Sequence, residues 1–115
     1  MKSHWGGQYI LGPDGRTPVR EPDLTKWGLW YETADRKVQK TAFGEVGVST
    51  VFLGLDHSFG GGRPMLFETM IFGGEHDGYQ ERYSTWDQAV AGHKAACALA
   101  SPLPGKAKRQ IDVEE

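Results

Sequence analysis

The feature that most limits the possible folds is a pair of segments with apolar residues at both odd and even positions. As strands, these segments would carry apolar side chains on both faces. Along residues 46–55, one face would carry Val46, Val48, Thr50 and Phe52, and the other Val51, Leu53 and Leu55. Residues 65–72 repeat the pattern, with Glu68 as an interruption. Such a pattern indicates a central strand that is covered twice, or one that a partner covers.

Weaker alternation predicts two further strands, over residues 37–43 and 79–83. Near the start of the chain, Pro13 and Gly15 occupy the second and fourth positions of a turn, which predicts a short hairpin over residues 8–19. Pro18 would confine the second arm of this hairpin to a sheet edge.

Helix start signals occur at two places. Asp23 is a good N-cap, and Leu24, Trp27, Tyr31 and Ala34 follow at helical spacing, so we expect a helix with an aromatic stripe that packs in the core. Ser84 or Thr85 begins the second helix, where residues 85–88 fit a capping box. Its inward face would carry alanines, His93 and Cys97, and Ser101-Pro102 would end it.

These elements predict an α+β fold, with a mainly antiparallel sheet of three to five strands flanked by an N-terminal and a C-terminal helix. The 115 residues suit one domain, which we place at 1–102, followed by a flexible tail at 103–115. Because only two helices are expected and two strands are apolar on both faces, a homodimer is a further hypothesis.

Charge and composition exclude several classes of function. Residues 41–100 contain only Arg63, Arg82 and Lys94 as basic side chains, too few for non-specific binding to nucleic acid. No apolar run approaches the ~18 residues that a membrane span needs. The single cysteine, Cys97, excludes an internal disulfide framework and indicates a reducing cytoplasm.

The loop over residues 56–64 is the first candidate site, because functional groups concentrate on loops held by rigid elements. Asp56 and His57 stand at its start, and residues 60–62 are glycines. Two interpretations stay open. In one, Asp56 caps the loop through backbone N–H groups and His57 packs at the sheet edge; in the other, His57 binds or catalyses.

Glu68 is the second candidate, because a carboxylate on an apolar strand face needs a partner or water. Arg82, on the neighbouring expected strand, could form an ion pair with it, and structural pairing and ligand anchoring both remain open. We expect no metal site, cofactor or catalytic nucleophile, and we interpret His93 and Cys97 as core residues. The expected binding residues are Asp56, His57, Phe59, Arg63, Glu68 and Arg82.

The segments VSTVFLGLDH at 48–57, LFETM at 66–70, FGG at 72–74 and RYSTW at 82–86 carry a resemblance. With residues 27–31 and Gly92-His93, they resemble a family of small uncharacterised proteins of bacteriophages and prophages, over roughly residues 24–93. The resemblance implies phage origin and expression in the host cytoplasm, but names no reaction. Arg63 departs from the pattern, which implies a small residue or proline there.

Three functional hypotheses follow. The first is a non-enzymatic accessory phage protein that binds a host protein, for example to inhibit a host defence or metabolic system. The second is a protein that binds or sequesters a small ligand such as a nucleotide, with Arg63 and Arg82 meeting phosphates. The third is a small enzyme that uses His57, Asp56 and Glu68 as acids and bases, for which these groups must lie within about one water of each other.

Overall fold

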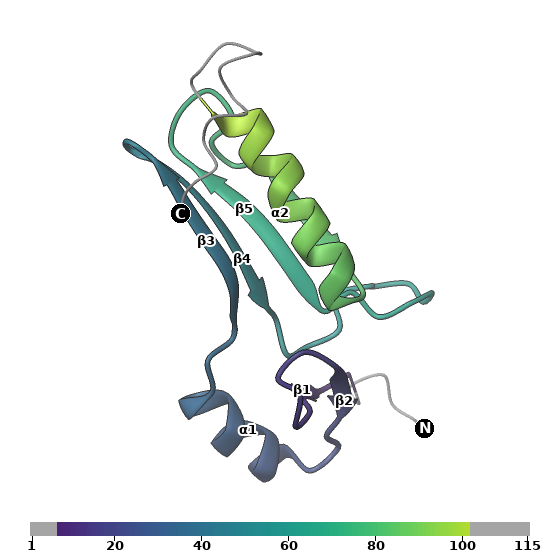
Figure 1. The fold of residues 1–115 in the computed structure, drawn as a ribbon. Helices are drawn as coiled ribbons and strands as arrows, with labels where there is room; N and C mark the ends of the chain where they lie inside the picture. The colour runs from purple at the N-terminus through teal and green to yellow at the C-terminus, as the bar shows by residue number, and fades with distance from the viewer. Residues whose placement is uncertain (1–6, 102–115) are drawn as a thin grey trace.

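A computed structural model describes residues 7–101, so the tail expected at 103–115 lies outside the described residues. Two helices and two antiparallel sheets make up the described part (Figure 1), which confirms the α+β prediction. It is elongated, with extents of 52 × 28 × 21 Å. Within the described residues, neither helix is long and apolar enough to span a membrane.

The larger sheet is an antiparallel meander with the strand order β3-β4-β5-β6. Its strands are β3 (Lys37–Phe43), β4 (Val46–Phe52), β5 (Phe67–Phe72) and β6 (Gln80–Tyr83). Strand β4 ends earlier than expected because Gly54 has a φ of 80° and turns the chain. The amide of Leu53 still bonds Leu66, but residues 54 and 55 pair with the first hairpin instead of extending the sheet.

Helix α2 (Trp86–Ala100) covers one face of this sheet, as Figure 1 shows. Thr85 is its N-cap and forms the predicted capping box with Gln88. The buried residues of the helix are small except for His93, which lets it approach the strands closely; they are Ala89, His93, Ala96 and Ala100. The apolar core lies between this helix and the inward side chains Val48, Phe52, Phe67 and Ile71.

A smaller unit extends from the end of β4, away from most of α2 (Figure 1). It contains the predicted hairpin, β1 (Tyr9–Leu11) and β2 (Pro18–Arg20), and the helix α1 (Leu24–Thr33), which Asp23 caps as expected. In the hairpin turn, hydrogen bonds from the side chain and amide of Thr17 lower the pKa of Asp14 to about 2.

Helix α1 attaches through its aromatic side chains. The indole Nε1 of Trp27 donates to the carbonyls of Tyr9 and Gly54, at 3.1 Å each. Trp30 packs edge-on against Phe52. The expected core stripe is nevertheless wrong in part, since no residue of α1 is buried and Leu24 is 65% exposed. The helix packs mainly on the small hairpin, which cannot enclose a whole helical face.

Close approach between α2 and β6 depends on Gly92. A Cβ built at this glycine would lie 2.0 Å from the hydroxyl of Tyr83. That hydroxyl is buried without a hydrogen-bond partner among the described residues. Burial also raises the pKa of Tyr83.

Replacing Gly92 with alanine should therefore destabilise the protein by roughly 1–3 kcal/mol, because the added methyl group forces Tyr83 or the helix to move. Gly28 in α1 is the matched control, since a Cβ there meets nothing within 4 Å. Gly28→Ala should stabilise by up to about 1 kcal/mol through helix propensity. Urea unfolding of both variants measures the difference, and a Gly92→Ala protein as stable as Gly28→Ala would contradict the packing described.

Candidate functional site

The loop over residues 56–64 connects β4 to β5 and projects beyond the sheet near the start of α2 (Figure 1). Asp56 closes its base. The amide of Asp56 donates to the carbonyl of Gly7, and its Oδ1 accepts from the amides of Ser58 at 2.8 Å and Met65 at 3.0 Å. The structure therefore places Asp56 in the capping position that the sequence suggested.

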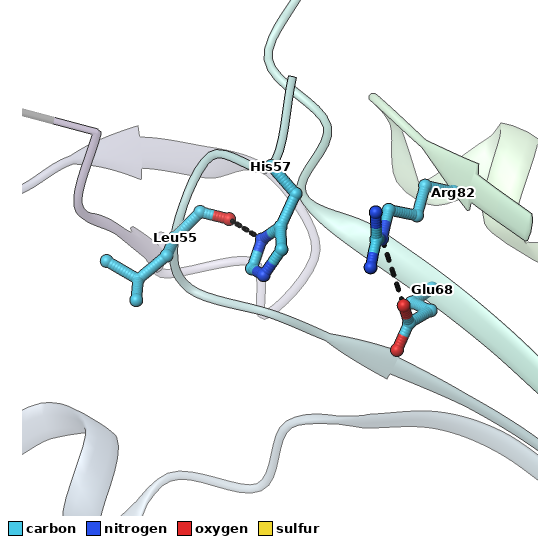
Figure 2. Close-up of polar contacts among 4 residues, drawn as sticks. All are labelled: Leu55, His57, Glu68 and Arg82. Carbon is cyan, nitrogen blue, oxygen red and sulfur yellow. Dashed lines mark hydrogen bonds and ion pairs between the residues drawn. The ribbon is translucent and has the colours of Figure 1, made fainter. Parts of the chain in front are cut away.

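His57 is held by both its backbone and its ring. Its amide donates to the carbonyl of Met65, and its ring Nδ1 lies 2.8 Å from the carbonyl oxygen of Leu55 (Figure 2). Because a carbonyl oxygen only accepts, Nδ1 must carry the proton. In the neutral ring, Nε2 is then an acceptor, and it makes no hydrogen bond with the described residues.

Phe59 stands at the tip of the loop and is 80% exposed, more than any other large hydrophobic residue described. Its φ of 47° makes it the one non-glycine residue of the described chain in the left-handed region. Its ring contacts the His57 ring edge-on, with 5.6 Å between centroids. A bulky side chain in this conformation costs roughly 1–2 kcal/mol, and such strain is concentrated at functional sites.

A hollow of about 770 Å³ lies beside Phe59. It is lined by Gly7 and by residues 55–62. This volume is in the range of small-ligand sites, and the polar side chains that line it are those of Asp56, His57 and Ser58. Arg63, at the end of the loop, is exposed and makes no hydrogen bond or ion pair with the described residues.

Glu68 and Arg82 form the predicted ion pair. They are direct neighbours on β5 and β6, and the Nε of Arg82 donates to Oε2 of Glu68 at 2.9 Å (Figure 2). The side chains are only 12% and 31% exposed. Since the partners satisfy each other, Arg82 is less available to a phosphate than the sequence suggested.

The three residues of the acid–base hypothesis have separate partners. Asp56 binds loop amides, His57 binds the carbonyl of Leu55, and Glu68 binds Arg82. No hydrogen bond joins any two of the three within residues 7–101. The same part of the chain contains no group of three or more metal-ligating side chains.

A second polar cluster is buried beneath α2. His93, 1% exposed, bonds the hydroxyl of Thr50 through Nδ1 at 2.7 Å and that of Thr41 through Nε2 at 2.9 Å. Thr50 also bonds Thr69. The prediction that His93 is a core residue is confirmed, but its partners Thr41 and Thr50, and Thr69 beyond them, were not predicted. The sequence pattern that could have revealed them is a threonine at an inward position on each of three strands, facing the side of the helix that carries His93.

Comparisons of the chain with protein-family models, with curated proteins and with solved structures found no match.

The buried cluster predicts a stability that depends on pH. Burial lowers the pKa of His93 below its ordinary 6.5, so the folded protein excludes a proton that the unfolded chain takes up. The stability is fully present above about pH 7 and falls as pH drops through 6.5 towards the lowered pKa, by at most about 1.4 kcal/mol per pH unit.

Urea unfolding at pH 7.5 and 5.5 measures this loss. His57→Gln is the control, because it removes a histidine that lies outside the buried cluster. His93→Gln should lower stability at both pH values and reduce the difference between them. An equal difference in His93→Gln and wild type would show that another group is responsible.

Proposed function

We propose that this protein acts by binding a partner protein through the loop over residues 56–64, with Phe59 as the anchor residue. The observation that carries the proposal is the exposure of Phe59 in a strained backbone conformation, on a loop whose base Asp56 fixes. Binding energy at protein interfaces concentrates in a few aromatic and arginine anchors. A fixed base also lowers the entropy lost on binding.

The surroundings of Phe59 define the chemistry of the partner surface. The His57 ring contacts the Phe59 ring, and Arg63 ends the same loop; within residues 7–101, neither Nε2 of His57 nor the Arg63 guanidinium has a hydrogen-bond partner. A matching surface would offer an apolar pocket for the ring, a hydrogen-bond donor for His57 and a carboxylate for Arg63.

The source of the partner follows from the sequence resemblance. Because the chain resembles small phage proteins, we propose that it works in the host cytoplasm on a host protein, for example as an inhibitor of a defence or metabolic system. This proposal needs no reaction, in keeping with the separate partners of Asp56, His57 and Glu68.

The hollow beside Phe59 favours a second candidate function, the binding of a small ligand. Its volume of about 770 Å³ would hold an aromatic heterocycle stacked on Phe59 with an N–H donor to His57. A nucleotide would have Arg63 for its phosphates, because Arg82 is occupied by Glu68. Thermal-shift measurements with nucleosides and nucleotides test this candidate, which predicts stabilisation that Phe59→Ala abolishes.

Phe59→Ala should abolish partner binding while leaving the fold intact, because the side chain makes few contacts within the chain. Leu24→Ala is the matched control, since Leu24 is an exposed apolar residue on α1, at 65% exposure. Immobilised wild type and both variants are incubated with bacterial lysate, and the retained proteins are quantified by mass spectrometry. We expect at least one protein that wild type and Leu24→Ala retain equally and Phe59→Ala retains at least ~10-fold less.

Retention of the same proteins at the same levels by all three would contradict the role of the loop. Thermal unfolding of the variants should differ from wild type by only a few degrees, which separates loss of binding from loss of fold.

A further inference from the structure

The second face of the larger sheet is covered by no element of residues 7–101. Inward side chains of β3 to β6 face α2, whereas alternate residues point to the opposite side, where Figure 1 shows no layer. This open face carries Lys37, Lys40, Ala42, Gly47, Ser49, Val51, Glu68, Met70, Phe72, Gln80 and Arg82. It is the face that the sequence predicted to need a cover.

The centre of the open face contains no unpaired charge. Val51, Met70 and Phe72 are its apolar side chains, and Phe72 is 51% exposed. Glu68 is neutralised by Arg82 at 2.9 Å. Lys37 and Lys40 lie on the edge strand β3, where their ammonium groups can reach water. Covering the centre would therefore bury apolar area without leaving a charge unsatisfied.

Large and small side chains on this face are segregated by strand. Strand β5 carries Phe72 and Met70, and their direct neighbours on β4 are Gly47 and Ser49. A Cβ built at Gly47 would meet nothing within 4 Å, so the ring of Phe72 does not fill the space above this glycine. The large side chains of Phe72 and Met70 on β5 therefore project beside the small residues Gly47 and Ser49, their paired neighbours on β4.

We propose that the open face binds the same face of a second copy of this chain, forming a symmetric dimer. A two-fold axis parallel to the strands, between β4 and β5, would place β5 of one protomer over β4 of its partner. Each Phe72 then enters the space above the partner's Gly47, and each Met70 lies over the partner's Ser49. Sheets that pack face to face in proteins keep their strands aligned in this way.

The other two-fold arrangement fits less well. An axis perpendicular to the strands would place β5 over β5, so that the large side chains oppose each other and the space above Gly47 stays empty. The favoured axis also keeps the strand direction, which puts the loops over residues 56–64 of both protomers at the same end. A dimer of this kind would present two Phe59 anchors to one side, although its formation does not depend on the function proposed for them.

The size of the face sets the strength of the dimer. Four strands about 4.8 Å apart and six residues at about 3.3 Å each give a face of roughly 19 × 20 Å. Two such faces bury roughly 800 Å² in projection, the size of weak, reversible complexes. We therefore expect a dimer that dissociates with a Kd on the order of 1–100 μM.

Sedimentation equilibrium over a concentration series around this Kd tests the proposal. Wild type should show a monomer–dimer equilibrium, and Phe72→Glu should weaken it by at least ~100-fold because it buries two uncompensated carboxylates. Phe59→Glu is the matched control, as an aromatic residue with 80% exposure outside the open face, and should leave the constant unchanged. Circular dichroism checks that both variants fold.

Gly47→Val separates dimerisation from a purely structural role. In the monomer the valine meets no neighbour and suits a strand better than glycine, so the free energy of unfolding should rise. In the dimer it fills the space needed by the partner's Phe72, so the Kd should rise at least ~10-fold. A wild type that stays monomeric at millimolar concentration, or dimerisation unaffected by Phe72→Glu or Gly47→Val, would overturn the proposal.

Discussion

The hydrogen bonds of His93 fix the position of the one helix that covers the sheet. The imidazole forms hydrogen bonds with the hydroxyls of Thr41 and Thr50, which places α2 across β3 and β4. The hydroxyl of Thr50 also forms a hydrogen bond with that of Thr69 on β5. Because His93, Thr50 and Thr69 are buried, each needs its partner, and a helix that slid or rotated would leave several polar atoms unsatisfied. The small alanine side chains let α2 approach the sheet closely, and the hydrogen bonds of His93 determine where the helix lies along the strands.

This arrangement uses α2, the longer of the two helices within residues 7–101, on one face. The shorter helix α1 cannot cover the other face, since its aromatic residues are attached to the hairpin and to the end of β4. Within residues 7–101, the core is enclosed on one side of the sheet, while the open face and the Phe59 loop both expose apolar side chains. Both features are suited to recognition, and they lie on different surfaces, so they can act independently.

Most elements were predictable because their signals are local. Alternation indicated the strands, and Asp23 and the capping box of Thr85 indicated the helix starts. The Glu68–Arg82 pair followed from one charge on an apolar strand. Strand register and the placement of α1 were not predictable, because they depend on contacts between distant segments. The depression at Gly47 beside Phe72 and the threonine partners of His93 became visible only with that register.

Helix α2 covers one face of the sheet, and the proposed dimer requires that a second copy covers the other. Hydroxyl-radical footprinting, read by mass spectrometry in dilute and in concentrated protein, tests both parts in one measurement. Phe72 and Met70 should be modified in dilute protein and protected in concentrated protein, while Phe59 is modified in both. Protection of Phe72 in dilute protein would mean that its own chain covers the face, and equal modification at both concentrations would mean that nothing does; either result contradicts the account.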